Sequence, residues 1–196
     1  MSNVKIAIVY FSKFGHTRLQ AEAVRDGAAA HPGAEVLLLD AAEAAKRIDE
    51  LDSYDAIVFG TATYMGNIAA GMKNFLEATV TKWGNGKWKD KIAGGFTNSS
   101  NFSGDKFNTM VGLMTTAMQL NMIWVGVGDT VGANEPGAES TVAGPSPECV
   151  NRNSASIGPM ASSFGVKTPA APPPGDIATA RSYGLRIAQI AARFKK

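Results

Sequence analysis

The sequence predicts an α/β protein built on a doubly wound, five-stranded parallel sheet. Apolar runs of four to six residues recur along the chain without polar alternation, which is typical of strands that are covered on both faces. Longer segments with apolar residues three or four positions apart separate these runs, as in amphipathic helices. Strands that alternate with helices form parallel sheets, and right-handed crossovers restrict their order. We expect the strand order 2-1-3-4-5.

Each element follows from this pattern in chain order. The expected strands are 6–11, 36–39, 56–59, 92–96 and 122–127. The expected helices are 18–30, 41–51, 68–80 and 105–120, and a last helix begins at Asp176 as its N-cap. The helix at 105–120 is apolar on much of its circumference, so we expect one face to meet the sheet and another to meet a second subunit.

Length and composition indicate one globular domain over residues 1–196. Hydrophobic residues make up 45% of the chain and charged residues 18%, and the net charge is only +2, with basic residues too scattered for a nucleic-acid surface. No apolar run approaches the roughly 18 residues of a membrane span, and no secretory segment precedes the first strand, so we expect a cytoplasmic protein. Residues 128–175 are a long irregular excursion, of a kind that is usually functional or disordered.

Cysteine and histidine are too sparse to build a metal site. Cys149 is the single cysteine, which excludes an internal disulfide and a cysteine-based metal site. His16 and His31 lack the spacing of metal ligands, and we expect His31 to be a solvated residue at a helix end.

The loop after the first strand has the chemistry of an anion site. Residues 12–17 (Ser-Lys-Phe-Gly-His-Thr) supply two hydroxyls, a glycine for close backbone approach, and N–H groups at a helix start. The loop matches neither the dinucleotide-binding nor the P-loop fingerprint. An ordinary strand–turn–helix with Thr17 as its cap is the alternative. Hydroxyls in place of several glycines favour a phosphomonoester held by side chains as well as by backbone.

Two more loops of small polar residues, each with an aromatic, follow the third and fourth strands, at 60–67 and 97–104. Because the carboxyl ends of parallel strands share one sheet edge, all three loops lie at that edge, where ligands bind beside the reversal of strand order. They predict a ligand with an anionic tail and a flat ring with polar edges.

The loops at 12–17 and 60–67 resemble those of the flavodoxin-like FMN-binding family. Within that family the chain is most similar to tryptophan-repressor-binding-protein-like (WrbA-type) NAD(P)H:quinone oxidoreductases and related NADPH-dependent FMN reductases, over most of residues 4–127 and again in the last helix. The chain departs from the WrbA-type pattern at Tyr64, where that pattern has Arg, at Asn121, where it has His, and in its less glycine-rich third loop.

The resemblance implies a position-by-position assignment of the FMN site. It assigns the phosphate to Ser12, Phe14, Gly15, His16 and Thr17. It places Thr63, Tyr64, Met65, Gly66 and Asn67 along the isoalloxazine ring, largely through backbone groups, and Ser99, Ser100 and Asn101 beside the ring and ribityl chain. For His16 we favour an electrostatic or positioning role over that of a base.

The resemblance also implies the reaction. Electrons pass from NAD(P)H through bound FMN to a quinone-like acceptor, with no metal and no required acid–base side chain, in a homodimer or homotetramer. The family leaves the choice between NADH and NADPH open.

Two other readings of the same fold remain open. One is a flavodoxin-type electron carrier, which the positive net charge and the long excursion disfavour; the other is a flavin-free interaction domain. A phosphoacceptor receiver is disfavoured, because no acidic pair follows the first strand and no Asp ends the third.

Four further side chains have two interpretations each. Trp83 and Trp88 are either ring-stacking lids or interface aromatics, with Trp83 the better candidate for the site. Arg152 and Lys167 could meet a nicotinamide phosphate, but we expect them to be solvated surface charges.

Overall fold

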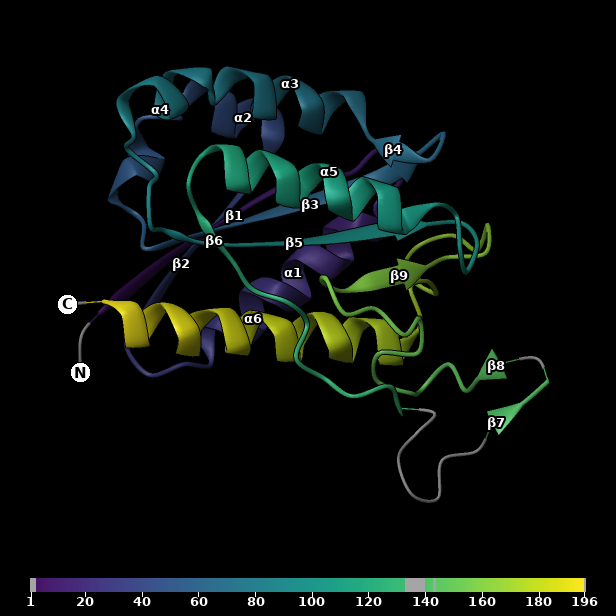
Figure 1. Ribbon diagram of the computed structural model, residues 1–196. Coiled ribbons are helices and arrows are strands. Elements are labelled where there is room, and N and C mark those ends of the chain that lie inside the picture. Colours follow the sequence, from purple (N-terminus) through teal and green to yellow (C-terminus); the bar gives the residue numbers. More distant parts are fainter. Residues whose placement is uncertain (1–2, 133–139, 143, 196) are drawn as a thin grey trace.

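A parallel sheet runs through the centre of the molecule, and helices cover both of its faces in the computed structural model, which describes residues 3–132, 140–142 and 144–195 (Figure 1). Its main strands are β1 (Val4–Phe11), β2 (Ala34–Asp40), β3 (Ala56–Tyr64), β5 (Ile92–Ser99) and β6 (Ile123–Trp124). They lie in the order β2-β1-β3-β5-β6, all parallel, which confirms the predicted order.

Two short strands extend this sheet to seven, where the sequence predicted five. β4 (Asn67–Ile68) pairs antiparallel with the end of β3, and β9 (Met160–Ser162) pairs parallel with residues 97–99 of β5. β7 (Ser140–Thr141) and β8 (Gly144–Pro145) form a separate hairpin.

Helices α1 (His16–Ala29) and α6 (Pro174–Phe194) cover one face of the sheet (Figure 1). The other face carries α2 (Ala41–Lys46), α3 (Ala70–Ala78), α4 (Val80–Asn85) and α5 (Lys106–Gln119), with the 3₁₀ turn η1 (Glu50–Ser53) before β3. Among the described residues, no helix is both long and apolar enough to cross a membrane.

The central strands are apolar on both sides because each side faces its own core. In β1, Ala7 and Val9 pack into the core under α2, α3 and α5, whereas Ile6 and Ile8 pack into the core under α1 and α6. This double coverage explains why the strands read as unbroken apolar runs in the sequence.

Two glycines allow α1 and α6 to pack with their backbones in contact. A Cβ at Gly27 would lie 1.8 Å from the carbonyl oxygen of Arg181, and one at Gly184 would lie 1.9 Å from that of Val24. The helix pair therefore tolerates no side chain at either position.

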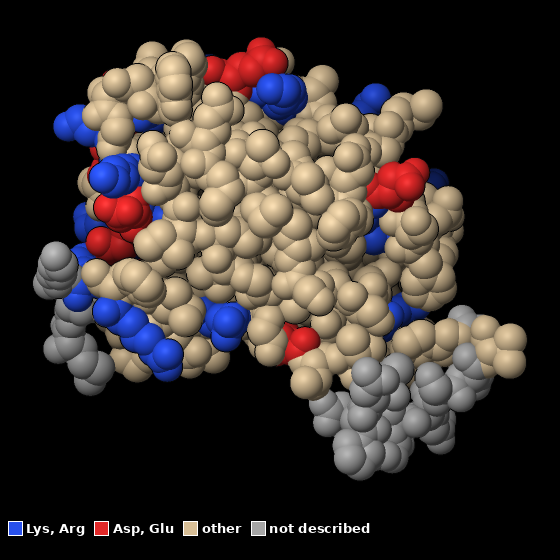
Figure 2. Space-filling view, viewed as in Figure 1, with Lys and Arg blue, Asp and Glu red and all other residues tan. Residues whose placement is uncertain are grey.

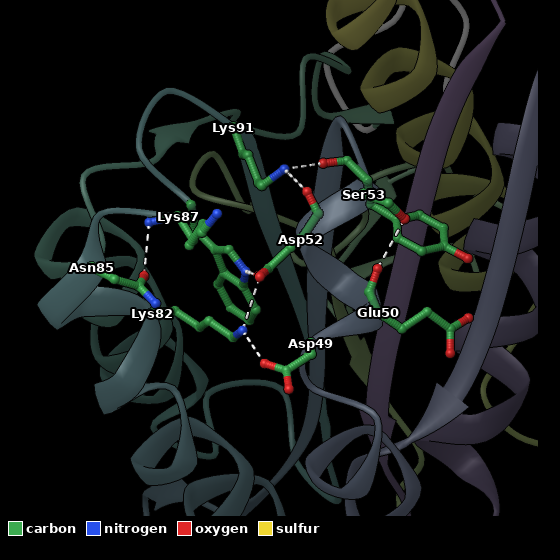
Figure 3. A network of polar contacts seen from close by, with 10 residues as sticks. Asp49, Glu50, Asp52, Ser53, Lys82, Asn85, Lys87 and Lys91 are labelled. Atoms are coloured by element: carbon green, nitrogen blue, oxygen red, sulfur yellow. Dashed lines mark hydrogen bonds and ion pairs between the residues drawn. The ribbon is translucent and has the colours of Figure 1, made fainter.

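A network of charged groups closes the end of the sheet at which the strands begin (Figure 3). Lys82 is 2% exposed, and its ammonium group contacts Asp49 at 2.5 Å and Asp52 at 3.0 Å. The indole nitrogen of Trp88 donates to Asp52 at 2.8 Å, and Lys91 donates to the Asp52 carbonyl. Trp88 is fully buried, so its expected place in a lid or interface is wrong.

Several predicted boundaries shift in the structure. The loop expected at 60–67 is strand as far as Tyr64, because Thr61 pairs with β5 and Thr63 pairs with β4, and Ile68 lies in β4 rather than in a helix. The helix expected at 41–51 ends at Lys46. The strand expected at 122–127 covers only Ile123–Trp124. Farther along, the N–H of Val127 donates to the Ser156 carbonyl, and β9 pairs with the end of β5 in place of residues 125–127.

Asp176 does not cap the last helix. α6 begins at Pro174, whose fixed φ suits a first helical position, and Asp176 is the third residue of its first turn. Its carboxylate accepts hydrogen bonds from the backbone N–H of Ser162 at 2.9 Å and from the Asn153 amide at 3.1 Å. The Asp176 carboxylate is therefore hydrogen-bonded to residues distant in sequence and not to the N–H groups of its own helix.

Candidate functional site

A cavity of about 580 Å³ opens at the carboxyl ends of β1, β3 and β5. The segments that form it are the loop after β1, the end of β3, the end of β5 with its loop, and residues 163–168. Its walls are Ser12, Phe14, His16, Thr17, Ala62, Thr63, Tyr64, Asn98, Ser99, Ser100, Ser163, Gly165, Val166, Lys167 and Thr168. The three predicted loops therefore do meet around one space, of a size usual for a small-molecule site.

The loop after β1 places the start of α1 at the cavity. Gly15 has φ 91°, a left-handed value that favours glycine, and its N–H donates to the Ser12 hydroxyl at 3.1 Å. Thr17 is 1% exposed and lines the cavity in the first turn of α1. The N-terminus of a 14-residue helix, with hydroxyls on both sides of it, suits a phosphate group.

The end of β3 contributes a hydroxyl and an aromatic ring. Thr63 is buried, and its hydroxyl bonds to those of Thr97 at 2.8 Å and Thr109 at 2.9 Å. The Tyr64 ring meets that of Phe14 edge to face, with centroids 6.3 Å apart. Burial raises the pKa of the Tyr64 phenol above its ordinary value.

The turn between β3 and β4 lies beyond the cavity wall. Met65 is fully exposed, Gly66 has φ 70°, and the Asn67 side chain accepts from the N–H of Ile68. Residues 65–67 are not part of the cavity lining. They could contact a bound ring only through their backbone groups or from outside the cavity wall.

The end of β5 brings Ser99 and Ser100 to the cavity, but it turns Asn101 away. The Asn101 carbonyl accepts from the ammonium group of Lys106 instead. Asn98, one residue before the predicted set, also lines the cavity. Its Oδ1 is buried with no hydrogen-bond partner in the described part of the chain, so the cavity wall holds a polar atom that lacks a partner.

Residues 163–168 form a strap that closes one side of the cavity, and sequence reasoning missed it. The N–H groups of Ser163 and Phe164 donate to the carbonyls of Ser99 and Ser100, at 3.0 and 2.6 Å. At the other side, Nε2 of His16 lies 2.7 Å from the Val166 carbonyl. The strap lies within the aperiodic segment, and no pattern in the sequence indicates which loops it joins.

Trp83 and Arg152 lie in surroundings that differ from those expected. Trp83 is on α4, 53% exposed, in a hollow it shares with α3 and the end of α5, so its expected place near the site is wrong. Arg152 is only 7% exposed, with its guanidinium 4.9 Å from the Phe102 ring centroid and 5.9 Å from that of Phe164, and is not a solvated charge. Lys167 is exposed, as expected, and lines the cavity.

The cavity residues fit FMN. A helix N-terminus with the hydroxyls of Ser12 and Thr17 suits its phosphate, and the aromatic rings of Phe14 and Tyr64 suit its flat ring system. The unpartnered Asn98 oxygen suits a ring N–H or ribityl hydroxyl donor.

Comparisons with known proteins agree with this fit. The family model of NADPH-dependent FMN reductases matches residues 4–133. A protein of Pseudomonas aeruginosa named flavodoxin FldP is 36% identical over 95% of this chain and 96% of its own length. The NAD(P)H dehydrogenase (quinone) of Geobacter sulfurreducens is 31% identical over 97% of this chain and 99% of its own.

A solved structure with a similar fold extends the agreement to three dimensions. The flavodoxin, WrbA-like protein of Agrobacterium tumefaciens superposes with a TM-score of 0.72, at 34% sequence identity, over 98% of this chain and 99% of the other. The match includes the segment after residue 133, from which the strap comes.

Proposed function

The chain belongs to the NADPH-dependent FMN reductase family, and from this premise we propose that it passes electrons from NAD(P)H, through FMN bound in the cavity, to a quinone-like acceptor. It is an FMN-dependent NAD(P)H oxidoreductase of flavodoxin-like fold. The observation that carries the proposal is the cavity itself, where a helix N-terminus and aromatic rings surround one space, and where the wall residue Asn98 has an amide oxygen without a partner in the described part of the chain.

The loop after β1 holds the phosphate end of FMN. Ser12 and Thr17 donate from their hydroxyls, and the N–H groups that follow Gly15 donate from the start of α1, where Gly15 allows the turn. Phe14 forms the wall between this end and the ring. His16 acts on the strap through the Val166 carbonyl, which makes it a positioning residue rather than a base.

The ends of β3 and β5 hold the ring system. Thr63 and Tyr64 face the ring from β3, and the backbone of Met65, Gly66 and Asn67 lies along its edge, above the cavity wall. From β5, Ser99 and Ser100 flank the ring and ribityl chain, and the Asn101 carbonyl fixes their loop through Lys106.

When bound, FMN supplies the transfer of a hydride from NAD(P)H and of two electrons to the acceptor. The chain's own residues would hold the phosphate and the ring and would exclude water from the part of the cavity that they line, and the opening of the cavity would admit the donor and the acceptor in turn.

We also place the protein in the cytoplasm, as a single domain that assembles into a homodimer or homotetramer. The uncharged face over α5 supports the assembly (Figure 2), because Phe107 is 66% and Met118 45% exposed there. Sedimentation at micromolar concentration tests it, and a monomer alone would contradict it.

The test of function is reconstitution followed by turnover. The purified chain is titrated with FMN, and the loaded protein is then mixed with NADPH in the absence of oxygen, first alone and then with a benzoquinone. We expect NADPH alone to bleach the flavin absorbance and the benzoquinone to restore it over many cycles. A protein that takes up no FMN at micromolar concentration would overturn both the cofactor and the reaction.

An electron carrier is the second candidate, favoured by the name of the Pseudomonas aeruginosa relative. A carrier binds FMN but needs a separate reductase to reduce it. The anaerobic mixture with NADPH alone therefore distinguishes the two functions, since a carrier keeps its oxidised spectrum.

A further inference from the structure

Lys106, the first residue of α5, is a buried cation behind the loop that follows β5. Its side chain is 1% exposed. The ammonium group donates to the hydroxyls of Ser99 at 2.9 Å and Ser162 at 3.0 Å. It also donates to the carbonyl oxygens of Asn101 at 2.6 Å and Phe102 at 2.7 Å. Because an ammonium group has three N–H donors, these four oxygens use its full capacity.

The positive charge of Lys106 is balanced at a distance rather than by direct contact. Asp176, 2% exposed, accepts from the N–H of Ser162, and the hydroxyl of the same Ser162 accepts from Lys106. Burial lowers the pKa of Lys106 to about 8, and the attraction of Asp176 offsets part of this loss. The ammonium group is therefore held in place at an energetic cost.

One of the four oxygens that surround the ammonium group, the Ser99 hydroxyl, belongs to a residue that lines the cavity. Ser99 accepts from Lys106 and lines the cavity, and Ser100 lines it next to Ser99. The carbonyls of the same two serines accept from Ser163 and Phe164 of the strap. One side chain thus fixes the loop after β5 and, through that loop, one end of the strap.

A methionine at this position would fill similar space without burying a charge, so packing alone gives no reason for the lysine. We propose that Lys106 is a positioning residue of the flavin site, which holds the loop after β5, and with it the cavity-wall residues Ser99 and Ser100, and places a positive charge one hydrogen bond behind Ser99. That charge favours reduced FMN, which carries more negative charge than oxidised FMN. The inference rests on the proposed function, because it requires FMN in this cavity.

Two substitutions separate the two parts of this role. Lys106→Met removes both the hydrogen-bond donors and the charge, whereas Lys106→Gln keeps an N–H donor for the loop carbonyls and removes only the charge. Lys89→Met, at an exposed position, is the matched control. For each protein, fluorescence titration gives the Kd of oxidised FMN. The midpoint potential of the bound flavin then gives the Kd of reduced FMN by linkage.

We expect Lys106→Met to raise the Kd of oxidised FMN by about tenfold or more, since hydrogen bonds of a charged group to the wall are lost. The Kd of reduced FMN should rise by roughly a further threefold, because the attraction between charges is also lost. In Lys106→Gln, the Kd of oxidised FMN should stay within about threefold of wild type. Its midpoint potential should be more negative than that of wild type, as it is in Lys106→Met.

Circular dichroism and thermal unfolding establish that each variant is folded, and Lys106→Gln carries the test if Lys106→Met does not fold. A folded variant with the wild-type Kd and the wild-type midpoint potential overturns the inference. Equal weakening of both redox forms shows a merely structural lysine and overturns the electrostatic part. Failure of the wild-type protein to bind FMN would instead refute the proposed function, so the two failures are distinguishable.

Discussion

The wild-type protein should lose stability as the pH rises from about 4 to about 6. Replacing Asp176 by asparagine should abolish this dependence on pH. The carboxyl group is 2% exposed, and burial raises its pKa from 3.8 to about 6. The N–H of Ser162 and the charges of Arg152 and Lys106 favour the charged form, but they offset only part of the desolvation.

The size and sign of the effect follow from this rise in pKa. At about 1.4 kcal/mol for each pKa unit, the rise from 3.8 to about 6 corresponds to about 3 kcal/mol. Between these two values the folded protein keeps a proton on Asp176 that the unfolded chain has already released. The stabilisation is therefore complete below about pH 4 and is lost as the pH rises through 6. Asparagine does not ionise and has no such dependence.

The assay is urea denaturation of wild-type protein and Asp176→Asn at intervals from pH 4 to pH 7, at one fixed excess of FMN. Asp90→Asn is the control, because it makes the same chemical change at an exposed position. We expect the free energy of unfolding of wild type, minus that of Asp176→Asn, to fall by about 3 kcal/mol across this range. A difference that stays constant with pH would refute the reasoning that burial dominates at Asp176.

Three other substitutions have expected outcomes. Lys82→Met removes the buried ammonium group that pairs with Asp52, and it should lower the free energy of unfolding in urea by about 2–3 kcal/mol without changing the affinity for FMN. The control Lys73→Met breaks an exposed ion pair and should lower it by under about 0.5 kcal/mol. Gly184→Ala, which drives a methyl into the α1 backbone, should cost about 3 kcal/mol or more, whereas Gly84→Ala, which meets nothing within 4 Å, should raise the melting temperature slightly. Thr17→Val keeps the packing but loses the hydroxyl at the start of α1, and fluorescence titration should show a Kd for FMN about tenfold higher; an unchanged Kd would place the phosphate elsewhere.

The sheet was predictable because its strands are covered on both faces. Unbroken apolar runs such as 6–11 and 56–59 located the strands, and crossover handedness with alternating helices restricted their order. The cavity at the carboxyl ends followed from the same topology. The ends of helices and strands were less predictable, because they depend on which strands pair. Thr61 and Thr63 look like loop residues, but Thr61 pairs with β5 and Thr63 pairs with β4.

The strap and the Lys106 network were not predictable from local pattern. Residues 163–168 have no periodicity, and contacts with Ser99, Ser100 and His16, distant in sequence, hold the strap. Lys106 looks like an ordinary surface residue at a helix start, but the loop after β5 and strand β9 bury it.

The sequence by itself determined the fold class, the strand order and the three loops that meet at one sheet edge, because burial and chain topology act through local apolar patterns. Only the tertiary structure decided which residues complete the cavity and which charges lie behind its wall. Those choices depend on desolvation and on hydrogen bonds between distant segments: Asp176 reads as a helix cap, yet it is a buried carboxylate bonded to Ser162.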